Sequence, residues 1–211
     1  MEPVRSQKGF SLIELLIVVS IALIIAGFAV PQYMTALRSY RIAGDARTIN
    51  GEIHLAKMRA AANFTWGRVY FDLDNNTFVS QLWCKTATPP CTAPDVWMSV
   101  AVGGPQNLSG DVSFGFGSQT APPPDTQATL ALAATCKAGA AGDPAGGSNE
   151  PGNTACIMFN SRGYPVDDLH ATTAEDAIYI TDGSAVQGVT VSFTGMTATW
   201  RASDATTWYR H

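Results

Sequence analysis

The first 62 residues carry two different patterns of apolar and polar positions. Over residues 10–30 the chain is apolar or small at every position except Ser11, Glu14 and Ser20. At a rise of about 1.5 Å per residue, a run of about 21 residues matches the thickness of a bilayer's hydrocarbon core. The pattern therefore predicts a transmembrane helix, with Glu14 as its one charged residue.

Beyond Pro31 the apolar positions become periodic. They recur at spacings of three and four, which is typical of one face of an α-helix: Ile42, Ala46, Ile49, Ile53, Ala56 and Ala60. Pro31 lacks an amide donor, and we expect it to bend the helix without ending it. The spacing predicts that residues 31–62 continue the helix as an amphipathic segment that packs against a globular domain.

After residue 62 the pattern changes to short runs rich in aromatic and β-branched residues. Residues 66–73 and 77–84 are two such runs, and the Asp74-Asn75-Asn76 sequence between them predicts a β-hairpin. Further strands are expected at 96–100, 112–116, 156–160, 177–181, 189–193 and 197–201. Repeated short strands separated by turns favour antiparallel pairing. We therefore expect an α+β fold, with the long helix packed on a β-rich domain at 63–211.

One stretch of this domain differs in composition. Residues 118–151 are rich in Ala, Pro, Gly and Thr, which predicts a long irregular insertion and not a second domain.

The chain has four cysteines, Cys84, Cys91, Cys136 and Cys156. An even number placed after a membrane helix fits an oxidising compartment and disulfide bonds. Of the three possible pairings we favour Cys84–Cys91 and Cys136–Cys156, because each joins the ends of a loop-like stretch. A zinc site is the alternative, although the sequence contains no Cys-x2-Cys or His-x3-His pair.

The charged residues bear on two questions, whether the chain binds nucleic acid and how its helix is oriented in the membrane. The formal net charge of −4 over 211 residues argues weakly against a nucleic-acid platform, because phosphate binding needs clustered cations. Arg5 and Lys8 before the apolar run favour a cytoplasmic N-terminus, and Arg38 and Arg41 after it weaken that asymmetry.

The junction before the apolar run has the form of a processing site. The sequence Lys8-Gly9-Phe10-Ser11-Leu12-Ile13-Glu14-Leu15 resembles the class III signal sequence of type IV pilin-like proteins. A secretory signal peptide would place its cleavage site after the apolar core, whereas Gly9-Phe10 precedes it. The resemblance implies that a prepilin peptidase/methyltransferase removes residues 1–9 by cutting between Gly9 and Phe10, and methylates the new amine of Phe10. An uncleaved anchor is the plainer alternative.

The same resemblance gives Glu14 a role. A free carboxylate in lipid costs roughly 3 kcal/mol, and Glu14 comes one helical turn after the amine of Phe10. In the family this acid is thought to pair with the N-terminal amine of a neighbouring subunit during assembly, which would neutralise two charges that lipid disfavours. The alternative is an acid that snorkels to the membrane surface. Pro31 falls where many pilins bend this helix.

A looser likeness concerns the domain. The helix with Arg47 and Arg59, the sequence Gly67-Arg68-Val69 and the later Phe159-Asn160-Ser161-Arg162-Gly163 resemble GspH/FimT-type proteins. These are minor pseudopilins of type II secretion systems and related minor pilins. FimT-type members carry a Gly-Arg-x-Arg element that contacts DNA. The matching stretch here, Gly195-Met196-Thr197-Ala198-Thr199-Trp200-Arg201, lacks the first cation, which argues against nucleic acid as a partner.

The sequence shows no complete catalytic or metal-binding motif. His54, His170 and His211 are the imidazole bases, and the sequence has no Gly-x-Ser-x-Gly, His-Glu-x-x-His or phosphate-loop motif. Asp72, Asp74 and Asn76 are spaced like the start of an EF-hand loop, but Thr77 replaces the expected Gly and no Glu closes the loop.

The acids at 167–168 and 175–176 could form a calcium site, as in related major pseudopilins, but solvated loop acids are the preferred interpretation. We expect no enzyme activity, no cofactor and no metal.

The resemblance implies a type IV pilin-like fold and a structural role. The chain would be a minor pilin or pseudopilin at the filament tip, supporting protein secretion or pilus biogenesis. Its partners would be the prepilin peptidase, other major and minor pilins or pseudopilins, the inner-membrane assembly platform, and membrane lipid before assembly. It would cross the bacterial inner membrane once, with a periplasmic domain, and then enter the pseudopilus or pilus. A DNA-binding or adhesive minor pilin used in natural transformation is the alternative, and an anchored periplasmic enzyme is the third.

Overall fold

The computed structural model describes residues 11–89, 91–100, 103–202 and 204–210. One helix, α1, runs over Leu12–Ala62 and continues through Pro31. The chain divides into two compact units, residues 1–39 and residues 40–211, so α1 contributes to both. The observed helix ends at the predicted residue.

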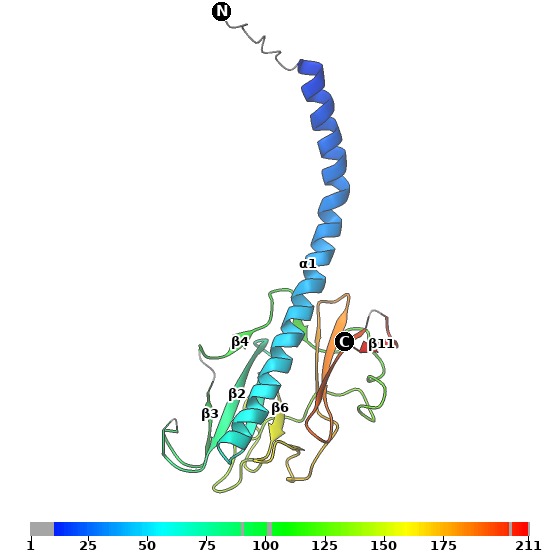
Figure 1. Cartoon of the computed structure of the whole chain (residues 1–211). Coiled ribbons are helices and arrows are strands. Elements are labelled where there is room, and N and C mark those ends of the chain that lie inside the picture. Colours follow the sequence, from blue (N-terminus) through cyan, green and yellow to red (C-terminus); the bar gives the residue numbers. More distant parts are fainter. Residues whose placement is uncertain (1–10, 90, 101–102, 203, 211) are drawn as a thin grey trace, which may run out of the picture. The chain divides into compact units, whose positions relative to one another are not determined.

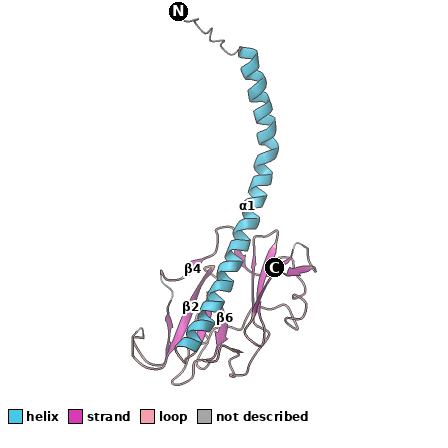
Figure 2. Ribbon diagram, viewed as in Figure 1, coloured by secondary structure: helices cyan, strands magenta, loops and turns pink. Residues whose placement is uncertain are grey.

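The second unit contains two antiparallel sheets (Figure 2). The six-stranded sheet has the order β3-β2-β1-β6-β7, and β4 also pairs with β2. Its strands are β1 (Gly67–Asp72), β2 (Thr77–Cys84), β3 (Val96–Ser99), β4 (Gln106–Asn107), β6 (Thr154–Phe159) and β7 (Pro165–Val166). The five-stranded sheet has the order β11-β10-β9-β8-β5. Its strands are β5 (Ser113–Phe114), β8 (Ala177–Thr181), β9 (Val186–Val191), β10 (Thr197–Ala202) and β11 (Trp208–Arg210).

The predicted hairpin and the α+β class are confirmed. Strands β1 and β2 pair from Gly67↔Leu82 to Asp72↔Thr77, with the turn between them. The Asp72 carboxylate accepts hydrogen bonds from the backbone amides of Asp74 (3.1 Å) and Asn75 (3.0 Å), so the acids of this loop hold a turn.

The main core lies between residues 40–62 of α1 and one face of each sheet (Figure 1). The predicted apolar face of the helix is confirmed, because each of its six members is at most 1% exposed. They pack with side chains from both sheets, among them Val69, Phe71, Phe78, Ile157, Phe159, Ile178, Ile180, Val189 and Val191. This segment of α1 therefore joins the two sheets into one domain.

The helix approaches β1 closely at Gly67. A Cβ atom there would lie 2.6 Å from the backbone oxygen of Ala56 and 3.1 Å from the Cβ of Ala60. Two alanines and a glycine thus form the contact, and no larger residue fits at Gly67 without moving the helix.

The helix ends in a Schellman motif with an unusual residue. The amide of Thr65 donates to the oxygen of Ala60 (3.0 Å), and the amide of Phe64 donates to that of Ala61 (3.3 Å). Phe64 takes the left-handed position with φ 48°, where glycine is the common choice, and its side chain is 78% exposed. A bulky residue is strained in this region of backbone conformation.

The insertion covers the outer faces of both sheets. Residues 118–151, all of them described, contain no helix or strand, only isolated bridges such as Lys137↔Asn149. Leu130 and Leu132 pack on the outer face of the five-stranded sheet with Tyr179, whereas Ala145 packs on the six-stranded sheet. Strand β9 packs against the main core on one face and beside the insertion on the other, and it is buried along its whole length.

The cysteines form the favoured pairs, Cys84–Cys91 and Cys136–Cys156. The second bond ties the insertion to β6. The amide of Cys156 also donates to the oxygen of Ala134 (2.8 Å). The insertion is thus fastened covalently and by backbone hydrogen bonds.

Candidate functional site

Among the N-terminal site residues, the structure places Glu14 and Pro31. Gly9 and Phe10 lie outside the described residues. Glu14 is exposed in the first turn of α1, where the amide of Leu15 donates to the oxygen of Ser11 (3.2 Å). The amides of a first turn have no partner within the helix, and an acid there interacts favourably with the helix dipole.

The helix around Glu14 presents apolar side chains on every side. Residues 11–36 are exposed throughout, including Leu12 (80%) and Leu23 (68%). Within the described part of the chain, α1 is the helix long and apolar enough to cross a membrane, with a mean hydropathy of 2.8 over its most apolar 18 residues. So much uncovered hydrocarbon requires lipid or other apolar partners.

Two hydroxyl groups of this segment, those of Ser20 and Thr35, are bonded within the helix. The Ser20 hydroxyl donates to the Leu16 oxygen (2.8 Å), and the Thr35 hydroxyl donates to the Pro31 oxygen (3.1 Å). A hydroxyl that bonds the carbonyl four residues earlier adds no unsatisfied donor to an apolar environment.

Comparison with protein families gives independent support for the interpretation of this segment. Residues 4–30 match the prokaryotic N-terminal methylation motif. No curated protein and no solved structure matches the chain. The methylation motif supports a type IV pilin-like subunit of a pilus or pseudopilus. It implies processing by a prepilin peptidase, assembly with other pilins, and a structural rather than an enzymatic role. The apolar helix that contains the motif suggests the membrane anchoring typical of pilins.

In the second unit, a buried cation organises the six-stranded sheet. The Arg68 side chain is 2% exposed. Its guanidinium donates to Gln81 (2.6 Å), to the backbone oxygen of Lys137 (2.5 Å) and to Glu150 (3.1 Å), and lies 4.3 Å from the ring centre of Trp97. Burial lowers the pKa of Arg68 to about 10. Arg68 therefore acts as a structural clamp between β1 and the insertion.

In the sequence, Gly67-Arg68-Val69 was recognised only as part of a family likeness, and Arg68 was not predicted to lie in the interior. The only local signal for a buried arginine was its position on a strand with aromatic neighbours. Two of its partners, Lys137 and Glu150, lie 69 and 82 residues further along the chain.

The cations near the C-terminus do not combine into one basic surface. In the β10–β11 pair, Trp200 lies opposite Arg210, and Arg201 lies opposite Tyr209. Side chains alternate between the two faces of a sheet, so Arg201 and Arg210 point to opposite faces. The stretch that resembles the DNA-contacting element therefore has Arg201 as its one cation, and Arg210 of β11 lies on the opposite face of the sheet.

The acids considered for calcium do not form a cluster of metal ligands. In the described part of the chain, no group of three or more His, Cys, Asp or Glu side chains could hold a metal ion. Asp167 accepts the amides of Leu169 (3.0 Å) and Ala171 (2.8 Å), which closes a tight loop. Asp176 has one buried oxygen without a partner, and burial followed by the charge of Asp167 raises its pKa to about 7.

Two of the histidines make side-chain contacts. His54 lies 2.8 Å from the hydroxyl of Thr197, joining α1 to β10. His170 lies 2.8 Å from Asp143, and that hydrogen bond lowers the pKa of the Asp143 carboxyl. His211 lies outside the described residues. Each contact joins two segments distant in sequence, which fits a structural role.

Proposed function

We propose that this chain is a minor pilin-like subunit that joins the tip of a type II secretion pseudopilus or a type IV pilus. The observation that carries the proposal is the match of residues 4–30 to the methylation motif, at the start of a helix whose apolar surface is uncovered. A buried-core helix would have a covered face, as residues 40–62 do.

The mechanism has three steps. A prepilin peptidase cuts between Gly9 and Phe10 and methylates the new amine. The helix then holds the subunit in the inner membrane with its domain in the periplasm. During assembly the carboxylate of Glu14 pairs with the Phe10 amine of a neighbouring subunit, and the apolar helices pack together in the filament core.

The Glu14→Ala variant tests the assembly step. We expect it to be processed normally, and its incorporation into filaments to fall at least about tenfold, because an unpaired amine in an apolar core costs a few kcal/mol. Ser20→Ala is the matched control, since the Ser20 hydroxyl bonds only its own helix in the structure. Mass spectrometry of the N-terminus reports processing, and immunoblots of sheared filaments report incorporation.

Each step of this mechanism would be excluded by a specific result. Normal incorporation of Glu14→Ala would exclude the pairing role. A mature chain that keeps residues 1–9, or a Phe10 amine without a methyl group, would exclude the processing site. A strain that lacks the chain identifies the machine: lost exoprotein secretion points to a pseudopilus, and lost surface piliation to a pilus.

A further inference from the structure

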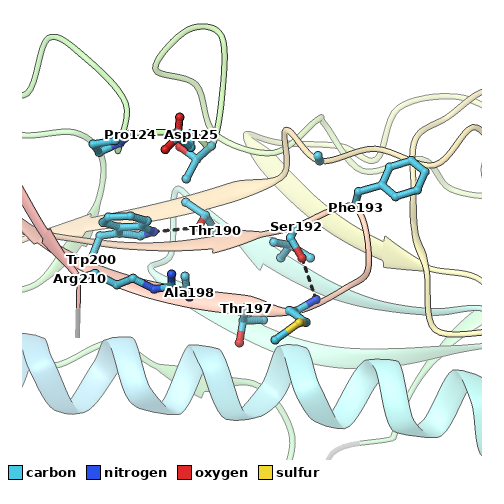
Figure 3. A pocket seen from close by; sticks show the side chains of 13 residues that line it. Pro124, Asp125, Thr190, Ser192, Phe193, Thr197, Ala198, Trp200 and Arg210 are labelled. Atoms are coloured by element: carbon cyan, nitrogen blue, oxygen red, sulfur yellow. Dashed lines mark hydrogen bonds between the residues drawn. The ribbon is translucent and has the colours of Figure 1, made fainter.

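A pocket lies on the outer face of the five-stranded sheet, where the strands meet the insertion (Figure 3). Its volume is about 330 Å³, which is at the lower end of ligand pockets, roughly 300–1,000 Å³. Cross-strand pairing sets its floor, because Thr190 lies opposite Ala198 and Trp200 lies opposite Arg210. The processing and assembly steps proposed above involve none of these residues.

The floor of the pocket is aromatic and fixed in orientation. The Trp200 indole N–H donates to the Thr190 hydroxyl at 2.9 Å, and the Arg210 guanidinium lies 5.9 Å from its ring centre. The bond satisfies the one polar atom of the indole, so Trp200 offers its apolar ring to a ligand. The ring needs no rearrangement before binding.

At one end the pocket opens onto two exposed apolar side chains of the β9–β10 hairpin. Phe193 is 53% exposed and Met196 is 67% exposed. The turn between them is held in place, because the Lys57 ammonium donates to the oxygens of Gly195 (2.9 Å) and Thr194 (3.3 Å). Trp, Phe, Met and Arg are the residue types enriched at protein interfaces, and here they share one rigid surface.

The other wall is a loop that is anchored at both ends. The Trp208 indole donates to the Ala121 oxygen (2.9 Å), and the Tyr179 hydroxyl donates to the Gln127 side chain (2.7 Å). Three successive prolines at 122–124 restrict the backbone between these anchors. Asp125 follows them in the left-handed conformation, φ 58°, and lines the pocket. Such a strained conformation is retained where the surrounding structure holds it.

The two charges at the pocket are opposite in sign and unpaired. Among the described residues, neither Asp125 nor Arg210 forms an ion pair. Asp125 stands on the loop wall and Arg210 on the sheet (Figure 3). A complementary ligand therefore has an apolar group between an acidic and a basic group. This combination is common in polypeptides, whereas a nucleic acid would bring only negative charge.

We propose that this pocket binds a polypeptide segment of another protein, with an aliphatic or aromatic side chain against Trp200 and Met196. An acidic residue of that segment pairs with Arg210, and a basic residue pairs with Asp125. The proposal does not depend on processing or filament assembly, because all the residues that line the pocket, from Pro124 to Arg210, belong to the second unit.

Selection of random heptapeptides displayed on phage, against the full chain in detergent micelles, tests the proposal. Enriched peptides should share an apolar residue with an acid within a few positions. One enriched peptide is then synthesised, and its dissociation constant is measured by fluorescence anisotropy. We expect Arg210→Gln to weaken its binding about tenfold, as the loss of one charged hydrogen bond does. Asp125→Asn and Met196→Ser should each weaken it several-fold.

Exposed residues elsewhere supply matched controls. Arg162→Gln removes a cation, and Leu169→Ser removes an apolar side chain that is 83% exposed, neither of which lines the pocket. Both variants should bind the peptide as the unaltered chain does. Equal binding by Arg210→Gln, a failure to enrich any shared motif, or equal losses in the two controls would overturn the proposal. Oligothymidine or chitotriose binding that depends on Arg210 would also overturn it, in favour of a nucleic-acid or carbohydrate site.

Discussion

The two parts of α1 differ in what their apolar residues contact. Residues 12–30 are apolar around the whole helix, and their large side chains are all exposed. Residues 40–62 carry apolar groups on one face, and that face is buried against both sheets. A helix with one apolar face can bury that face against its own domain. A helix that is apolar on all sides needs lipid or other protein chains to cover the rest of its surface. The hydrophobic pattern thus distinguishes a folding segment from an assembly segment within one continuous helix.

The largest expected effect on stability comes from making the same substitution, isoleucine to alanine, in each of the two parts of α1. Ile53→Ala should lower the free energy of unfolding by about 2–5 kcal/mol, because Ile53 is fully buried and leaves a cavity. Ile24→Ala should change it by less than about 0.5 kcal/mol, because the Ile24 side chain is exposed and its truncation leaves no cavity. Urea denaturation of the full chain in micelles, followed by tryptophan fluorescence, measures both. Similar losses would remove the distinction between the two parts.

The close contact at Gly67 gives an intermediate effect. Gly67→Ala should cost about 1–3 kcal/mol, since the added methyl would overlap the backbone oxygen of Ala56. Gly44→Ala is the control, because its Cβ would meet nothing within 4 Å and alanine favours helix by about 1 kcal/mol. The two substitutions should therefore shift the urea midpoint in opposite directions. A stable Gly67→Ala would mean that the helix can move away from β1.

The smallest expected effect lies at the end of the packed part. Phe64→Gly should raise stability by about 1 kcal/mol, because glycine adopts the left-handed conformation without strain. Phe64→Ala keeps the strain and removes the exposed ring, so it should leave stability nearly unchanged. Thermal unfolding of the two variants side by side measures the difference. A loss of stability in Phe64→Gly would show that the ring contributes packing that outweighs the strain.

Local patterns were sufficient to predict much of this fold. The end of α1 at Ala62, its buried face and the β1–β2 hairpin follow from spacing and turn residues close in sequence. The same holds for the two disulfides, each of which closes one loop. In contrast, the very short strands β4 and β7 contain too few residues to show any alternation. Strand β9 begins three residues before the predicted run and ends two before its end, because buried Gln187 and Gly188 interrupt the apolar pattern.

The candidate sites also differ in whether their residues are close together in the sequence. Gly9, Phe10 and Glu14 belong to one contiguous motif, so the sequence alone suggested the assembly segment. The Arg68 clamp and the pocket at Trp200 are made of residues brought together across more than 80 positions. Their partners lie in the irregular insertion, whose path depends on the Cys136–Cys156 bond and on packing against both sheets. Such sites become visible only when the fold is known.

The internal hydrogen bonds of Ser20 and Thr35 have a consequence for how the first part of α1 can be moved. A hydroxyl that is hydrogen-bonded to a backbone oxygen of its own helix needs no donor or acceptor from the surrounding lipid or protein. When the helix moves from lipid into a bundle of apolar helices, its surroundings remain hydrocarbon. The hydrogen bonds of these two hydroxyls need not be broken. Within residues 12–30, Glu14 is therefore the described side chain whose partner must be supplied at the destination.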